Sequence, residues 1–177
     1  MTSGKLYLVI PAICMALFCM VLIGTERMNA QMTHKIGTFD SRAVAIAYYN
    51  SKNFKNTMES IMSEMKTAKE KGDKKAIAKI EREKSLRQAM MHEQGFGKGS
   101  INNIIDMVKE KIAVLAKNEN LTTIVSKWEV VYSRADVELV DITEKIVDFF
   151  EPNERMKEMT KEVLKSEPIK DAYLIED

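Results

Sequence analysis

The sequence has few of the residues that interrupt helices and few of those that form catalytic or metal sites. Its 177 residues include three prolines and seven glycines, and aromatic residues make up 7% of the chain. The two histidines, His34 and His92, are too far apart for a metal-ligand spacing. Both cysteines, Cys14 and Cys19, precede residue 20, so a chain that starts after residue 30 has neither a disulfide nor a thiolate nucleophile. We therefore expect a helix-rich protein that is not an enzyme and holds no cofactor.

A large net charge is also absent. The formal net charge is +1, which indicates no nucleic-acid partner. The glycine-rich stretch at 95–100 lacks the Walker spacing and follows a helical pattern instead of a strand, so it predicts no phosphate site. The charges are nevertheless uneven, because eight basic and four acidic residues lie between Lys66 and Lys84, against seven basic and fourteen acidic from Glu129 to Asp177. This polarity is typical of solvated helix faces, and a functional basic patch is the alternative.

One long hydrophobic run is present, from Leu6 to Ile23. Lys5 precedes this run and the small residue Ala30 follows it, as in a secretory signal peptide that is cleaved after residue 30. The 18 apolar residues also reach the lower limit for a membrane-spanning helix. We expect an exported protein with a signal peptide at residues 1–30, and an uncleaved membrane anchor is the alternative.

A long helical hairpin is predicted near the middle of the chain. Residues 35–39 are predicted to form a strand, and Asp40 or Ser41 is a suitable N-cap for the helix after it. No glycine or proline occurs from Arg42 to Lys71, and a second helical pattern starts at Lys74 after the Gly72-Asp73 turn. The first pattern carries a seam at heptad spacing, formed by Phe54, Met58, Ile61, Met65 and Ala68. Two helices joined by so short a turn form an antiparallel hairpin, which we expect to project from a small body.

The rest of the chain predicts a small sheet and short helices. Ser100 is expected to cap a helix that ends near Asn118, and residues 121–125 are expected to form a strand with 129–132 as its hairpin partner. A capping box at 141–144 is expected to open a helix that Pro152 ends, followed by a helix at 154–165 and a frayed tail at 166–177. The fold class is therefore mainly α with a small β body (α+β). Three short strands bury little surface, so we expect oligomerisation.

Three parts of the sequence resemble the Skp/OmpH family of periplasmic chaperones. They are the segment KIGTFD at 35–40, the lysine-rich hairpin around Gly72-Asp73, and the segment LTTIVSKWEVVYSRADVELVDITEKIVDFF at 121–150. The resemblance covers about residues 35–150 and implies a Skp/OmpH-like domain at 31–150. It implies an arm at about 42–118, a β body formed by 35–40 and 119–150, and a homotrimer in the periplasm. Residues 151–177 form a C-terminal extension beyond the family pattern, and the near-neutral charge also departs from the often basic family.

The resemblance further implies a holdase, which binds unfolded outer-membrane or envelope proteins and prevents their aggregation. It implies no catalytic residues and no nucleic-acid partner. An exported protein can also lie close to the membrane surface. One alternative is a membrane-anchored coiled-coil scaffold of the cell envelope, and another is a basic arm that binds an anionic envelope polymer. Flexible methionines and long lysines near the hairpin tip are the expected client contacts. They are Met58, Met62, Met65, Lys66, Lys69, Lys71, Lys74, Lys75, Met90 and Met91.

Overall fold

The computed structural model describes residues 34–175, which lie within one compact unit. The predicted signal peptide and the apolar run from Leu6 to Ile23 lie outside the described residues. Within residues 34–175, no helix has both the length and the hydrophobicity needed to cross a membrane.

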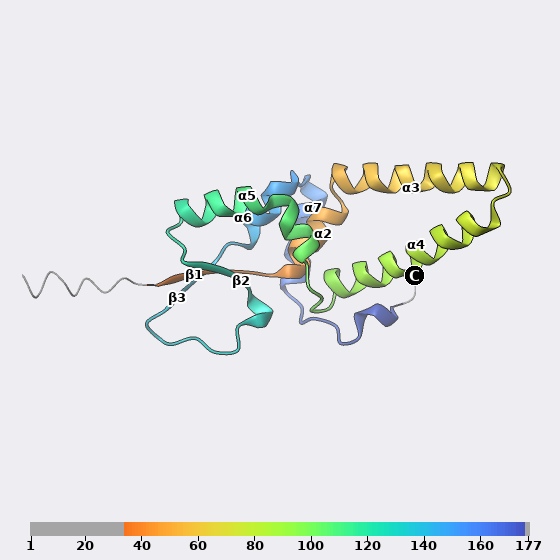
Figure 1. The fold of residues 1–177 in the computed structure, drawn as a ribbon. Helices are drawn as coiled ribbons and strands as arrows, with labels where there is room; N and C mark the ends of the chain where they lie inside the picture. Colours follow the sequence, from red (N-terminus) through yellow and green to blue (C-terminus); the bar gives the residue numbers. More distant parts are fainter. Residues whose placement is uncertain (1–33, 176–177) are drawn as a thin grey trace, which may run out of the picture. The chain divides into compact units, whose positions relative to one another are not determined.

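The described residues are mostly helical and contain a small three-stranded sheet, which confirms the predicted fold class at the level of α+β (Figure 1). The strands are β1 (Lys35–Phe39), β2 (Thr123–Ser126) and β3 (Glu138–Asp141). The α-helices are α2 (Ser41–Tyr49), α3 (Lys52–Glu70), α4 (Lys74–Gly95), α5 (Asn102–Asn118), α6 (Thr143–Val147) and α7 (Glu154–Leu164). The 3-10 helices are η1 (Lys127–Glu129), η2 (Asp148–Phe150) and η3 (Ala172–Leu174).

The sheet has the strand order β2–β1–β3, and both strand pairs are parallel. The predicted strand at 35–39 is confirmed as β1, and β2 begins two residues later than predicted. The predicted hairpin partner at 129–132 is wrong, because the third strand is β3 and residues 127–137 connect it to β2. Since β2 and β3 run in the same direction on either side of β1, the chain has to travel back along the sheet between them.

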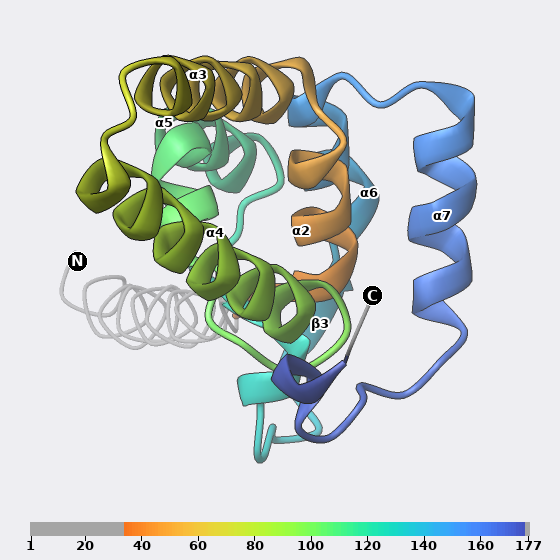
Figure 2. The ribbon, with the colours of Figure 1, turned by 90° about the vertical axis from the view of Figure 1, so that its right-hand side faces the viewer.

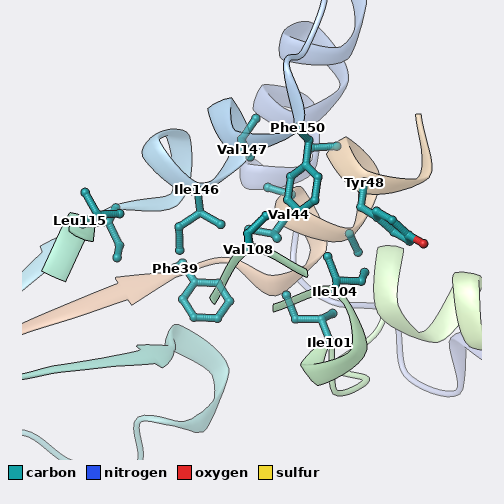
Figure 3. Close-up of a cluster of buried hydrophobic side chains, with 14 of the residues drawn as sticks. Phe39, Val44, Tyr48, Ile101, Ile104, Val108, Leu115, Ile146, Val147 and Phe150 are labelled. Carbon is teal, nitrogen blue, oxygen red and sulfur yellow. The ribbon is translucent and has the colours of Figure 1, made fainter. Parts of the chain in front are cut away.

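Helix α2 lies at the centre of the body. Its residues from Ser41 to Tyr48 are all buried, and the helix packs against α4, α6 and α7. The side chain of Asp40 caps it by accepting a hydrogen bond from the Arg42 amide, as predicted. Helices cover one face of the sheet, and the buried side chains of β1, α2, α5 and α6 meet there in one hydrophobic cluster (Figures 1 and 3). Its largest members include Phe39, Val44, Tyr48, Ile104, Val108, Ile146 and Phe150.

The uninterrupted helical pattern predicted from Arg42 to Lys71 is divided in two. Helix α2 ends at Tyr49 and α3 begins at Lys52, with two polar residues between them. The Asn50 side-chain amide donates to the Ile46 carbonyl, and the Ser51 hydroxyl accepts from the Phe54 amide. These two caps end one helix and start the next without glycine or proline. The predicted arm at 42–118 is accordingly too long, because α2 and α5 belong to the buried body.

The projecting hairpin consists of α3 and α4. Gly72 has a φ of +65° at the predicted turn, where a residue with a side chain would be strained, and the Asp73 side chain caps α4 by accepting from the Ala76 amide. The predicted seam of α3 is confirmed, since Phe54 and Ala68 are buried and the other seam residues, Met58, Ile61 and Met65, are half-buried. Figure 1 shows the two helices meeting at the turn and separating toward the body. Residues 81–86 of α4 are consequently all exposed.

The glycine-rich segment after α4 bends tightly around one glutamate. A Cβ atom added at Gly97 would lie 2.8 Å from the Glu93 carbonyl oxygen, so only glycine fits this position. The predicted cap at Ser100 is confirmed only weakly, because its hydroxyl accepts from the Asn102 amide at 3.4 Å while Ile101 occupies the N-cap position. At the second predicted cap, Asp141 accepts from the Thr143 amide at 2.8 Å, and α6 starts at that threonine.

The C-terminal extension folds back over the body (Figure 2). The predicted helix at 154–165 is confirmed as α7, which packs against α2, and η3 packs against α4. The frayed tail predicted for 166–177 is wrong as far as residue 175. The Ile169 amide donates to the Phe96 carbonyl, and Ala172 is fully buried. Long-range contacts that no local pattern displays therefore order this segment.

Candidate functional site

The first candidate surface is the α3–α4 hairpin, which carries all ten predicted contact residues. The five lysines are exposed around the turn, where side-chain amines extend into solvent. Met62 and Met90 are 67% and 39% exposed. Leu86, which the sequence reasoning did not single out, is 62% exposed in the stretch where the two helices separate. The hairpin thus presents a few exposed apolar side chains along its length and a group of lysines around its turn.

The other three methionines contribute to packing. Met65 is half-buried in the seam between α3 and α4, while Met58 and Met91 pack against the hydrophobic core at the base of the hairpin. The structure therefore brings the five lysines together near the turn and distributes the five methionines along the whole hairpin. Leu86 lies four residues before Met90 in the same helix, so the helical spacing places the two exposed apolar side chains on one face of α4.

The second candidate surface is the outer face of the sheet. Strand alternation and register place Ile36, Thr123 and Leu139 on this face, opposite the helices. Leu139 is 46% exposed, and in the connection from β2 to β3 Val131 and Tyr132 are 98% and 81% exposed. A shallow hollow lies between this connection and the strands. Because purely parallel sheets are normally covered on both faces, an apolar outer face with such a rim is typical of an interaction surface.

A buried charged cluster lies where β1 meets α2. The carboxylate of Asp40, which is fully buried, accepts two hydrogen bonds from the Arg42 side chain, at 3.1 and 2.8 Å. The Lys127 amine lies 2.9 Å from the same carboxylate, and the Trp128 indole nitrogen donates to it at 3.1 Å. The Arg42 guanidinium also donates to the carbonyls of Val163 and Ser166. The cluster therefore joins β1, η1 and the end of α7.

The surroundings of Asp40 favour the charged form of its carboxylate. Burial by itself raises the pKa of Asp40, but hydrogen bonds from Arg42, Lys127 and Trp128 outweigh burial and hold the pKa below its usual value. The guanidinium and the Lys127 amine both lie against the Trp128 ring, 4.8 and 4.5 Å from its centre. The sequence reasoning assigned Asp40 only a capping role and did not single out the other three residues, because their contacts join distant parts of the chain.

No group of three or more histidine, cysteine, aspartate or glutamate side chains within residues 34–175 is arranged to hold a metal ion. No protein-family model, curated protein or solved structure matches this chain.

Proposed function

We propose that the protein is a periplasmic holdase chaperone that binds unfolded outer-membrane or envelope proteins and prevents their aggregation. The observation that carries the proposal is the exposure of Met62, Leu86 and Met90 on a hairpin whose turn is rich in lysines. Flexible apolar side chains that are spread over a surface make weak contacts with many sequences, which is what holding an unfolded chain requires.

The proposal includes a Skp-like homotrimer, in which the β bodies join the copies and the three hairpins act as arms around a shared space. The exposed outer face of the sheet, with Val131, Tyr132 and Leu139, supports this part, because a second copy could cover it. Each hairpin then contributes a few weak contacts, and the three together hold a client through avidity. The lysines near the turn attract acidic segments of a client at long range.

The alternative of a coiled-coil scaffold is supported less well. It requires the apolar seam of α3 to pair between copies of the chain. Half-buried Ile61 and Met65 of this seam pack instead in the hairpin, where α3 lies against α4 of the same chain. A scaffold would also leave the exposed Leu86 without a role.

An aggregation assay tests the proposed function. A denatured outer-membrane β-barrel protein is diluted into buffer with and without residues 31–177, and light scattering follows its aggregation. We expect suppression at near-stoichiometric amounts. Replacing Met62, Leu86 and Met90 by serine should raise the amount needed for half-suppression several-fold, because each weak contact with a client buries only part of an apolar side chain.

A matched control uses three similarly exposed apolar residues outside the hairpin. Met107, Val114 and Leu174 are 58%, 60% and 66% exposed, and their replacement by serine should leave the suppression unchanged. If the wild-type protein does not suppress aggregation, or if the two triple variants lose suppression equally, the holdase proposal is wrong.

A further inference from the structure

A cleft lies in the body, between α5, the edge strand β2 and the glycine-rich segment before α5. Its volume is about 230 Å³. Its floor is apolar and includes Ile105 and Ile112 of α5 together with Ile124 of β2. A cavity of about 150 Å³ holds a benzene ring, so this cleft has room for one large apolar side chain and a small polar group attached to it.

One end of the cleft is suited to an anion. The first turn of α5, a helix of 17 residues, lies there. Its N-cap residue, Ile101, has no capping side chain, and the Ser100 hydroxyl accepts only from the Asn102 amide, at 3.4 Å, so the first turn still carries the positive end of the helix dipole. The Ser41 side chain also lines the cleft. Ser41 as a whole is only 4% exposed, and its hydroxyl makes no hydrogen bond within residues 34–175, so the hydroxyl is available to a polar ligand that enters the cleft.

The charged side chains at the mouth are compatible with an anion. Exposed Lys98 lines the cleft, and its amine lies 5.6 Å from the centre of the Trp128 ring. Glu129 is the acidic residue of the lining and is exposed at the rim. The charge of the nearby Asp40 is already neutralised, because both Arg42 and Lys127 contact its carboxylate.

The strand beside the cleft indicates which kind of molecule carries the anion. Strand β2 is at the edge of the sheet, and no other strand of the described chain pairs with its outer side. An extended peptide can add to such an edge through backbone hydrogen bonds. If it runs parallel to β2, its carboxyl end reaches the end of the strand that borders the first turn of α5.

We propose that this cleft binds the carboxyl-terminal residue of an extended peptide. The apolar side chain of that residue occupies the isoleucine floor, and its carboxylate accepts hydrogen bonds from Ser41, Lys98 and the first turn of α5. The inference does not rest on the proposed chaperone function, because the cleft lies in the body and its occupancy is measured without a client.

The fluorescence of Trp128 reports on binding directly, since it is the one tryptophan of the chain and lines the cleft. A hexapeptide that ends in leucine with a free carboxylate is titrated into residues 31–177. Two further ligands are compared with it: the same peptide with an amidated end, and 4-methylpentanoate, which has the same side chain and carboxylate without a peptide. We expect saturable binding of the free-carboxylate peptide and at least about tenfold weaker binding of the amidated peptide, from the loss of charge-assisted hydrogen bonds.

Variants test each part of the site. Lys98→Ala should weaken binding about tenfold and Ser41→Ala several-fold, whereas Glu129→Gln should tighten binding because it removes the one rim carboxylate. Lys161→Ala is the matched control, since this lysine is exposed on α7 away from the cleft, and it should bind like the wild type. Equal binding of the two peptides, or equal effects of the two lysine variants, would overturn the site. If 4-methylpentanoate binds as tightly as the peptide, the assignment to a peptide is wrong.

Discussion

At the scale of single residues, Asp40 is the position where we expect a substitution to destabilise the body most. Its carboxylate contacts Arg42, Lys127 and Trp128, and both Asp40 and Arg42 are almost completely buried. An exposed ion pair contributes little to stability, but removing one partner of a buried pair leaves the other charge without compensation. The two situations occur side by side in this protein, because Arg134 and Asp136 form an ion pair on the surface.

Asp40→Asn is expected to lower the free energy of unfolding by about 3–5 kcal/mol at pH 7. The substitution keeps the shape of the side chain but leaves the Arg42 guanidinium without a counter-charge. Urea unfolding followed by circular dichroism measures the change. Asp136→Asn is the control and should cost less than about 1 kcal/mol, since its ion pair is exposed. Equal costs for the two variants would mean that the buried pair does not stabilise the body.

The stability that Asp40→Asn loses should depend on pH. The pKa of Asp40 is lower in the folded protein than the ordinary value of 3.8, so the folded state binds its proton less readily than the unfolded state. The stability that this charge contributes is therefore complete above the ordinary pKa and is lost as the pH falls through the folded pKa. The difference in unfolding free energy between wild type and Asp40→Asn should stay constant from pH 7 to about 5 and shrink below about pH 4. A difference that widens on acidification would contradict this reading.

At the scale of the elements, the sequence predicted those that local signals define. Glycine marks the turn at Gly72-Asp73, heptad spacing marks the seam of α3, and alternation of apolar and polar residues marks β1. Each of the three lies where it was expected. The partners of β1 were not predictable in the same way. Pairing of β1 with β3 joins residues about one hundred positions apart, whereas residues 129–132 have strand-forming side chains but lie in a connection.

The division between α2 and α3 is a second example. Asn50 and Ser51 favour caps but are tolerated in helix interiors, so their presence alone does not distinguish a break from a continuous helix. The break is set by tertiary packing, because α2 is buried on all sides while α3 leaves the body. The hairpin surface could thus be predicted in outline, but the charged cluster and the cleft depend on contacts between distant segments.

Ser51→Ala should lower the free energy of unfolding by about 1 kcal/mol, because the Phe54 amide loses its capping oxygen at a buried position. Chemical denaturation measures this cost. Ser60→Ala, on the exposed side of α3, should be neutral or slightly stabilising, since alanine has the higher helix propensity. If both variants behave alike, the junction is not fixed by this cap.

The C-terminal extension gives a further prediction at this scale. The Tyr173 amide donates to the Glu93 carboxylate, and Ala172 is fully buried where η3 packs against α4. These contacts should restrain the base of the hairpin. Ala172→Asp should detach η3, because a buried carboxylate without a partner is strongly unfavourable. Hydrogen exchange should then become faster in the last turns of α4 while the sheet stays protected.

Leu174→Asp is the matched control, since Leu174 lies in the same 3-10 helix and is 66% exposed. This variant should leave the exchange rates of α4 at their wild-type values. If Ala172→Asp also leaves them unchanged, the extension does not restrain the hairpin.

At the scale of the whole molecule, the question is what covers the outer face of the sheet. Val131 and Tyr132 are almost completely exposed beside the half-exposed Leu139, and the proposed trimer would bury all three. Replacing Val131 and Tyr132 by aspartate adds two negative charges to each copy at this face. We expect the double variant to be monomeric, and light scattering of the eluting protein should show one third of the wild-type mass.

Replacing Ile169 and Tyr173 by aspartate supplies the control, because these side chains are 51% and 52% exposed on the extension and lie outside the proposed interface. This variant should keep the wild-type mass. If the wild-type protein is already monomeric, the trimer proposal is wrong. The monomeric variant also tests whether holding a client depends on assembly. Each hairpin keeps Met62, Leu86 and Met90, so a monomer has the same contact residues and lacks only the other two hairpins. If avidity is the source of holding, the monomeric variant should suppress aggregation far less per hairpin than the trimer does.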